Sequence, residues 1–360
     1  MLHLQNISLY QYKNYLSTRF DITQNIIGIC GNNGLGKTNL LDAIYFLCFS
    51  KSYFSKTDGA SVHKGLQGMR LEGNFIKQQQ AEKVVCILRE NNRKELQRNG
   101  EEYKRFSQHV GQFPVVMIAP DDVELITGTS EIRRKFIDTL LSQLDSSYLT
   151  ALIQYNKVLQ QRNSLLKAAA ERGYLDQALL DILTRQLVQP GEQLYERRRD
   201  FLATFLPSVA KNYQHIAGAP EPIELNYYSP LAQDGFLKLL VDYQQKDLML
   251  QRTTLGTHRD DIEIKLQSDA FKNIASQGQR KSLLFALKLA AFEELKVAKG
   301  FAPILLLDDV FEKLDGGRMN NLLYSVCSNN QGQVFITDTD KARLERALQA
   351  IEVQYQLIEL

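Results

Sequence analysis

The most informative segment of this chain lies at residues 31–38, which read Gly31-Asn32-Asn33-Gly34-Leu35-Gly36-Lys37-Thr38. The segment matches the pattern G-x-x-x-x-G-K-[ST] without exception. Before it, residues 25–30 are almost continuously apolar and predict a buried strand. After it, residues 38–49 carry apolar side chains at helical spacing. This strand–loop–helix order predicts a site for the phosphates of ATP, and a glycine-rich turn without a ligand is the alternative.

Each part of the segment has a physical role. Glycines let backbone N–H groups turn toward phosphate oxygens, and the N-terminus of the following helix favours an anion. Lys37 is expected to place a positive charge on the β- and γ-phosphates and to take part in catalysis. The Thr38 hydroxyl is expected to bind Mg²⁺. We therefore expect residues 31–38 and the adjacent Asn39 to contact the nucleotide.

A second element of such a site lies far along the chain. Ile304-Leu305-Leu306-Leu307 is an apolar run that predicts a buried strand, and Asp308 and Asp309 follow it. Asp308 is expected to hold Mg²⁺, and Asp309 is expected to polarise the attacking water as a catalytic residue. Alone, the run would indicate a core strand ending in two solvated acids. Together with residues 31–38 it indicates an ATPase.

A third segment narrows the class of ATPase. Residues 275–280, Ala275-Ser276-Gln277-Gly278-Gln279-Arg280, precede a predicted helix. They resemble the signature motif of ABC-type ATPases, in which a Ser hydroxyl and a Gly amide reach the γ-phosphate held by a second subunit. Ser276, Gln277 and Gly278 are then expected to bind ATP in trans, and a simple helix cap is the alternative. Leu314-Asp315 stands where the D-loop of an ABC-type ATPase is expected. Simple P-loop kinases and GTPases have no signature segment, so residues 275–280 favour the ABC class.

With these motifs in order, the chain resembles the RecF family, bacterial recombinational-repair ATPases related to the heads of SMC-type chromosome proteins. The resemblance covers nearly the whole chain. The further segments that carry it are Lys13-Asn14-Tyr15, Ile132-Arg133-Arg134-Lys135-Phe136-Ile137-Asp138, residues 155–163, Gly256-Thr257-His258-Arg259-Asp260-Asp261 and Ile336-Thr337-Asp338-Thr339.

The resemblance implies a protein that clamps DNA without sequence specificity when it binds ATP. It implies a homodimer formed head to head on ATP binding, with Lys13 among the nucleotide contacts. It also implies work with RecR, and through RecR with RecO, to bring RecA onto gapped DNA during repair and replication restart.

The chain departs from the general ABC pattern at several positions. Asp309 stands where most ABC enzymes have Glu, and Thr337-Asp338 stands where transporters keep a switch His. Glu312 replaces the usual Ser of the D-loop, and Lys51-Ser52-Tyr53-Phe54 looks like the family's K-S-x-R segment with Phe for Arg. A shorter carboxylate without a His behind it predicts slow hydrolysis that serves as a switch.

The amino-acid composition limits the ways in which this chain could bind DNA, metal ions or membranes. Lys plus Arg (43) nearly balances Asp plus Glu (41), so DNA contacts must come from local clusters. Arg133-Arg134-Lys135 and Arg197-Arg198-Arg199 are candidates, although a basic helical run is usually a solvated face. The four cysteines are far apart, which argues against a zinc cluster and fits a reducing cytosol. Without a signal peptide or a membrane-length apolar run, we expect a cytoplasmic protein with no membrane partner.

The chain is long enough for two domains, at roughly 150 residues each. We expect an α/β ABC-type ATPase head built from residues 1–120 and 245–360, interrupted by a mainly helical domain at 121–244. Two helical stretches, about 147–171 and 175–189, flank Gly173 and predict a short arm. Pro190-Gly191 is expected to break or kink the second stretch, and Pro207 to help end the helical region. Predicted strands lie near residues 2–9, 20–22, 69–76, 83–88, 115–119, 223–228, 262–266 and 333–337, and predicted helices at 280–298, 318–328 and 341–348.

Other interpretations stay open at this stage. The main alternative is the ATPase head of another SMC-like machine, such as an overcoming-lysogenisation-type nuclease. It would need a long coiled coil or an acidic nuclease domain, and the stretch between Lys37 and Asp308 offers only a short arm. A transporter subunit is disfavoured by the missing His. His258-Arg259-Asp260-Asp261 could be an acid–base or metal cluster, but its spacing favours a salt-bridged structural turn.

Overall fold

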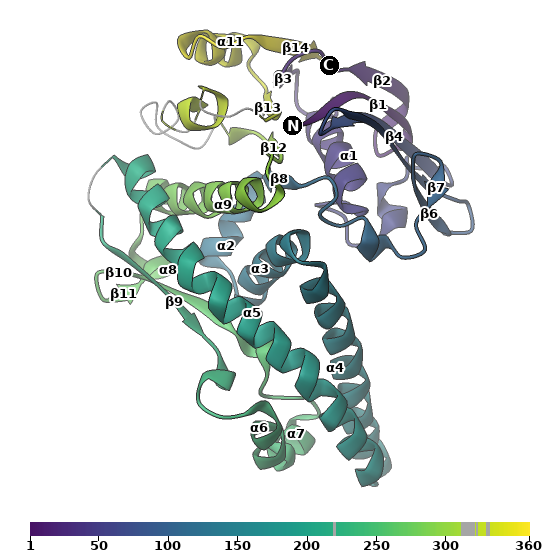
Figure 1. Cartoon of the computed structure of the whole chain (residues 1–360), viewed down its shortest axis with the longest axis vertical. Coiled ribbons are helices and arrows are strands. Elements are labelled where there is room, and N and C mark those ends of the chain that lie inside the picture. The colour runs from purple at the N-terminus through teal and green to yellow at the C-terminus, as the bar shows by residue number, and fades with distance from the viewer. Residues whose placement is uncertain (219–220, 311–320, 322, 329–331) are drawn as a thin grey trace. The chain divides into compact units, whose positions relative to one another are not determined.

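The computed structural model describes residues 1–218, 221–310, 321, 323–328 and 332–360 (Figure 1). The chain divides into two compact units, which are taken here one at a time. Unit 1 comprises Met1–Val123, Asn212–Pro220 and Ser276–Leu360, and unit 2 comprises Glu124–Lys211 and Glu221–Ala275. The predicted second boundary at residues 244–245 therefore differs from this division. Residues 245–275 fall in unit 2 because they contain β10 (Asp261–Leu266), which pairs along its length with β9 (Ile223–Tyr228).

A parallel sheet forms the centre of unit 1. Its strand order is β14-β3-β13-β12-β8, and every neighbouring pair is parallel. The three inner strands are buried at every residue, as expected when both faces of a sheet are covered. The strands are β3 (Ile26–Cys30), β8 (Val115–Ile118), β12 (Ile304–Leu307), β13 (Val334–Asp338) and β14 (Tyr355–Glu359).

A six-stranded antiparallel sheet, in the order β2-β1-β4-β5-β6-β7, completes the β-structure of unit 1. Its strands are β1 (Leu2–Tyr12), β2 (Tyr15–Asp21), β4 (Met69–Lys77), β5 (Gln80–Leu88), β6 (Lys94–Arg98) and β7 (Glu101–Glu102). Helix α1 (Lys37–Phe49) contacts strands of both sheets (Figure 1). Its buried side chains join both sheets in one hydrophobic core. Helix α9 (Gln277–Lys299) contacts β8, and α11 (Lys341–Ala350) contacts β3 and β13.

Unit 2 is mainly helical. It contains α2 (Glu124–Thr127), α3 (Ser130–Leu144), α4 (Ser146–Arg172), most of α5 (Gln177–Ala217), α6 (Phe236–Asp242), α7 (Gln244–Leu250) and α8 (Phe271–Ile274). A small antiparallel sheet, β11-β10-β9, accompanies them, with β11 at Asp269–Ala270. Helix α4 begins after Asp145, whose side chain accepts the Ser147 N–H, and it ends at Gly173 with φ 68°. The predicted break at Gly173 between two helices is confirmed.

Helix α5 shows that the expected break at Pro190-Gly191 and the expected end near Pro207 are wrong, whereas a kink at Pro190-Gly191 stays a prediction. It runs without interruption through Pro190-Gly191 and through Pro207, and it ends at Ala217. Each proline removes one backbone hydrogen bond, and this loss alone predicted the end of the helix. Leu187 and Leu194, one turn to either side of Pro190-Gly191, are fully buried, so side-chain packing offsets that loss.

The other predicted elements are largely confirmed, with boundaries shifted by a few residues. No strand was predicted at β6, β7, β11 or β14. The predicted helix at 318–328 lies partly outside the described residues, and its described end, Tyr324–Ser328, is a π-helical turn. Within the described residues, no helix combines the length and apolarity needed to cross a membrane. The expected α/β ABC-type head with a helical insertion is confirmed.

Candidate nucleotide-binding site

The phosphate loop connects the end of β3 to the start of α1, as its sequence pattern predicts. Gly36 immediately precedes the helix with φ 115°, in the left-handed region that favours glycine. A Cβ at Gly36 would lie 2.5 Å from the Asn14 side-chain nitrogen and 2.7 Å from the Tyr15 hydroxyl. The loop is therefore held closely by residues 14–15, and a larger residue at position 36 would adopt a strained φ and displace these side chains.

Lys37 lies at the start of α1 and is only 5% exposed. Its ammonium donates to two carbonyl oxygens of its own loop, that of Gly31 at 2.7 Å and that of Asn32 at 3.1 Å. The positive charge thus lies against the first two residues of the loop, a position from which it can reach a phosphate bound by the loop.

Thr38 and Asp308 meet although 270 residues separate them. The Thr38 hydroxyl lies 3.0 and 2.9 Å from the two carboxylate oxygens of Asp308. Parallel pairing brings this about: β13 lies between β3 and β12, so the carboxyl ends of the three strands open on the same edge of the sheet. A hydroxyl and a carboxylate are oxygen ligands of the kind that Mg²⁺ prefers, so the donor set fits this ion.

Burial tunes the Asp308 carboxyl. Its pKa is raised to about 6, chiefly because burial removes water from the charged form, and the nearby Asp309 charge adds to the effect. Thr337 opposes the shift by donating its hydroxyl to Asp308 at 2.8 Å. The same hydroxyl accepts the backbone N–H of Asp309 at 2.8 Å. Asp309 itself adopts φ 45°, in the left-handed region that non-glycine residues rarely occupy. The Thr337 hydroxyl thus holds the Asp308 carboxylate and the Asp309 backbone in place. From the sequence, Thr337 was noted only because it stands where transporters keep a His.

Comparison with known proteins agrees with this geometry. Residues 3–358 match the family model described as RecF/RecN/SMC N terminal domain. The chain is 42% identical over 359 residues to the DNA replication and repair protein RecF of Flavobacterium johnsoniae, and the match spans 100% of both chains. The chain belongs to the RecF family. A second relative, the RecF of Parabacteroides distasonis, is 39% identical and matches over 98% of this chain and 96% of its own.

Solved structures extend the comparison to the fold. A structure of the recombination mediator protein RecF-ATP in the RecFOR pathway superposes with a TM-score of 0.87 at 28% identity, covering 95% of this chain and 93% of the other. A RecF-ATPrS structure gives a TM-score of 0.88 at 27% identity and covers 100% of this chain and 96% of the other. An Smc head domain from Pyrococcus furiosus, at 17% identity and a TM-score of 0.53, shares the fold. The resemblance to RecF is thereby confirmed.

The RecF-family segment at residues 13–15 fastens the β1–β2 turn to the phosphate loop. Asn14 donates to the Leu35 carbonyl at 2.9 Å and accepts from the Asn39 side chain at 2.7 Å. Lys13, expected among the nucleotide contacts, pairs instead with Asp42 of α1 at 2.6 Å. The nucleotide role of Lys13 and Asn39 stays a prediction, and sequence reasoning missed Asp42 as the partner of Lys13.

The signature segment of this RecF-family chain begins α9. Ser276 caps the helix: its hydroxyl accepts the Gln279 N–H at 3.2 Å, and its own N–H donates to the Gln279 side chain at 2.8 Å. Ser276 and Gln277 are exposed and Gly278 is half-buried, so the segment is open to a second molecule. The cap is present, and binding in trans stays a prediction. Glu312 and Leu314-Asp315 lie outside the described residues.

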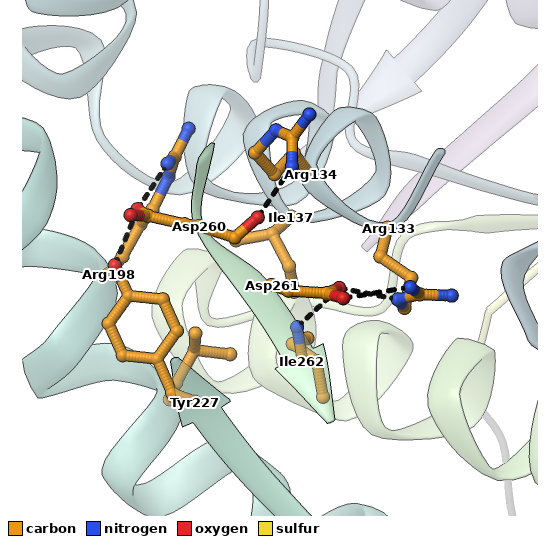
Figure 2. A pocket seen from close by; sticks show the side chains of 9 residues that line it. Arg133, Arg134, Ile137, Arg198, Tyr227, Asp260, Asp261 and Ile262 are labelled. Atoms are coloured by element: carbon orange, nitrogen blue, oxygen red, sulfur yellow. Dashed lines mark hydrogen bonds and ion pairs between the residues drawn. The ribbon is translucent and has the colours of Figure 1, made fainter. Parts of the chain in front are cut away.

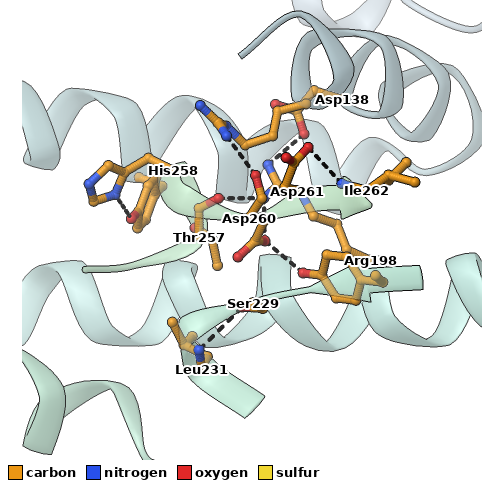
Figure 3. Close-up of polar contacts among 12 residues, drawn as sticks. Asp138, Arg198, Ser229, Leu231, Thr257, His258, Asp260, Asp261 and Ile262 are labelled. Atoms are coloured by element: carbon orange, nitrogen blue, oxygen red, sulfur yellow. Dashed lines mark hydrogen bonds and ion pairs between the residues drawn. The ribbon is translucent and has the colours of Figure 1, made fainter. Parts of the chain in front are cut away.

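In unit 2, the RecF-family segment at 256–261 is a salt-bridged cluster (Figure 3). His258 bonds the Tyr155 hydroxyl at 2.7 Å and the Thr253 carbonyl at 3.0 Å, and burial lowers its pKa to about 4. Asp260 accepts from Arg198 and from the Tyr227 hydroxyl, each at 2.6 Å. Burial raises the pKa of Asp260 even though Arg198 opposes the shift. This supports the structural interpretation, and in the described part of the chain no group of three or more His, Cys, Asp or Glu side chains could hold a metal.

The same cluster engages three of the candidate DNA contacts in internal bonds. Arg133 forms a two-pronged ion pair with Asp261 at 2.7 and 3.0 Å, and Arg134 donates to the Asp260 carbonyl at 2.5 Å (Figure 2). Arg198 is 3% exposed and pairs with Asp138 at 2.7 Å as well as with Asp260. These guanidinium groups hold unit 2 together, and buried Arg198 does not face solvent. The exposed members of the two runs, Lys135, Arg197 and Arg199, stay candidates for DNA phosphates.

Proposed function

We propose that this RecF-family chain binds ATP with Mg²⁺ at residues 31–39 and Asp308, and that the ATP-bound form holds DNA. The observation that carries the proposal is the meeting of Thr38 with Asp308 beside a buried Lys37. The match to RecF-ATP and the naming of its relatives as DNA replication and repair proteins support it.

The chain's own residues fit this task. The Lys37 ammonium can exchange its two loop carbonyls for phosphate oxygens with little movement, because it already lies across the loop. Thr38 and Asp308 would hold Mg²⁺, which supplies positive charge that offsets the charge of the phosphates. Asp309, held by Thr337 through its backbone N–H, would orient a water for slow hydrolysis.

We infer that ATP also controls assembly. Ser276, Gln277 and Gly278 lie at the N-terminus of the 23-residue helix α9, where N–H groups favour an anion. In a head-to-head homodimer this end of α9 would contact the γ-phosphate held by the partner, so the clamp would close only with ATP. In the cell such a clamp would act in the cytoplasm, stimulated by DNA, with RecR and RecO as partners in loading RecA at gaps.

Retention of DNA tests the proposal. Wild-type protein is incubated with beads that carry duplex, gapped or single-stranded DNA. Each incubation contains ATP–Mg²⁺, ADP–Mg²⁺, ATP plus EDTA, or no nucleotide, and the protein retained after washing is measured. We expect retention on duplex or gapped DNA with ATP–Mg²⁺ alone, across unrelated sequences, and weaker retention at higher salt. Equal retention in all four nucleotide conditions would contradict ATP control, and no retention in any of them would contradict DNA binding.

A further inference from the structure

A buried carboxylate on α1 gathers four groups from outside that helix. Asp42 is fully buried, and its Oδ2 pairs with the Lys13 ammonium at 2.6 Å. The same oxygen accepts from the Tyr12 hydroxyl at 2.6 Å and the Ser52 hydroxyl at 2.7 Å. Its Oδ1 accepts the backbone N–H of Tyr53 at 2.7 Å. The helix that starts at the phosphate loop is thereby bonded both to the β1–β2 turn and to residues 52–53.

Tyr53 continues these contacts on its other side. Its hydroxyl donates to Oδ1 of Asp122 and accepts from the Lys288 ammonium at 2.9 Å. Burial, followed by the Asp122 charge, raises the pKa of this hydroxyl well above its ordinary value, so it stays protonated and able to donate. Its ring packs edge-on against those of Tyr45 and Phe54, with centroids 5.0 and 5.2 Å apart.

Lys288 belongs to α9, twelve residues after the capping Ser276, or about 18 Å along the helix axis. The side chain is 5% exposed, and its ammonium also reaches Oδ2 of Asp122 at 2.9 Å and the Met117 carbonyl of β8 at 2.7 Å. An ammonium buried among three oxygens fixes the rotation and the axial position of the helix that carries it, because leaving any of them unpaired is costly. A shift of Tyr53 would therefore change the rotation or the axial position of the whole of α9.

We propose that Tyr53 is a positioning residue that couples the phosphate loop of a subunit to the signature segment of the same subunit, by joining Asp42 of α1 to Lys288 of α9. The inference rests on the proposed function, since it concerns how ATP bound in one subunit prepares that subunit's α9 for the partner. Lys13 is the natural trigger: any movement of its ammonium away from Asp42 toward phosphate changes the charge balance at the carboxylate that holds Tyr53.

Removing one oxygen atom tests the coupling. Tyr53→Phe keeps the ring contacts, including that with the Lys288 ammonium 5.4 Å from the ring centroid, and leaves Lys288 paired with Asp122 and Met117. Helix α9 therefore loses only its hydrogen bond to residue 53. The matched control is Tyr45→Phe, which changes a neighbouring tyrosine of the same aromatic cluster; within the described residues no hydrogen bond joins the Tyr45 hydroxyl to α9. Thermal unfolding of both variants checks that each is folded.

We expect Tyr53→Phe to bind ATP within twofold of wild type in a fluorescent-nucleotide titration at monomeric concentrations. The dissociation constant of its ATP-dependent dimer should be at least about tenfold higher than that of wild type, because coupling between sites typically changes affinities by 5–150-fold. Amide exchange at 277–288 should respond to ATP in wild type and in Tyr45→Phe but not in Tyr53→Phe, a change that lost packing alone would not produce.

Three outcomes are distinguishable. Dimerisation of Tyr53→Phe within twofold of wild type, with ATP-dependent exchange intact, overturns the coupling role. An equal loss in Tyr45→Phe also overturns it, because the effect would then belong to the aromatic cluster and not to the hydroxyl. Failure of wild type itself to bind ATP or to dimerise with it would overturn the proposed function instead.

Discussion

Lys37 is a buried cation whose acceptors belong to its own loop, and this makes it the sharpest single test of the site. A charge-assisted contact to phosphate is worth about 1.5–3 kcal/mol. Replacing Lys37 with Met should therefore weaken ATP binding by at least about tenfold and abolish ATP-dependent retention on DNA. A fluorescent-nucleotide titration measures the first effect; unchanged affinity would refute the assignment of residues 31–39.

The residue at position 309 determines the rate of ATP hydrolysis that we expect. Its side chain is one methylene shorter than Glu, and Thr337 stands where transporters keep a His, so the water would be held less well. A misplacement of about 1 Å can cost roughly a hundredfold. Turnover should stay well below the ~10 s⁻¹ typical of enzymes and should rise with DNA. Phosphate release measured with and without DNA checks this, and a DNA-free rate above that typical value would contradict it.

His109 predicts a pH dependence of stability. It is fully buried, its Nε2 lies 2.7 Å from the Leu47 carbonyl, and burial lowers its pKa to about 4. The unfolded chain binds a proton at this His near pH 6.5, whereas the folded chain stays neutral until about pH 4. Stability should therefore fall as pH drops through this window, by up to about 3 kcal/mol.

Urea unfolding at pH 7.5, 6.0 and 5.0 measures the slope. His109→Gln should make the dependence between pH 6.5 and 5 shallower whatever its absolute stability, and the contribution of His258, whose pKa burial also lowers to about 4, should remain. His215→Gln changes an exposed His and should keep the wild-type slope. If both variants keep the wild-type slope, His109 does not cause the dependence.

At the scale of elements, α5 depends on packing more than on its own backbone. A Cβ at Gly191 would lie 2.7 Å from Cδ1 of the buried Phe236 of α6 and 3.1 Å from Cε2 of Tyr155 of α4. Gly191→Ala should destabilise the protein by about 1–3 kcal/mol through overpacking, despite the better helix propensity of Ala. Chemical denaturation measures it. Gly59→Ala, where the nearest atom is 3.7 Å away, should change stability by less than about 0.5 kcal/mol.

The elements also show which features a sequence can predict. Residues 31–38 and 304–309 carry their signals in a few consecutive residues, and their strand–loop–helix and strand–acid settings are confirmed. Asp42 and Tyr53 carry no such signal, because their partners lie as far away as Lys288 and only the folded sheet order brings them together. The continuation of α5 through its two prolines and the internal pairing of Arg198 were missed for the same reason. A local rule cannot weigh packing between distant segments.

At the scale of the whole molecule, assembly should depend on the γ-phosphate. A two-fold dimer with two nucleotides between its subunits gains stability from any contact that only ATP provides. Light scattering should show dimers with ATP and mostly monomers with ADP or without nucleotide.

Ser276→Arg sharpens this test. The larger side chain should crowd the partner's γ-phosphate and block dimerisation, whereas ATP binding within one subunit should persist because Lys37 and Thr38 are untouched. A dimer that forms without nucleotide, or a Ser276→Arg variant that dimerises normally, would mean that residues 275–280 serve only as a helix cap.

The pairing of β14 with β3 has a practical consequence for these experiments. Leu360 donates its N–H to the Cys30 carbonyl at 3.0 Å, and its carbonyl oxygen would lie 2.8 Å from a Cβ placed on Gly31. A purification tag, fluorophore or surface anchor fused after Leu360 would therefore start beside the first glycine of the phosphate loop. Met1 is exposed and lies instead against Gln78, in the turn between β4 and β5. Fusions for the titrations and the scattering measurements belong at the amino end.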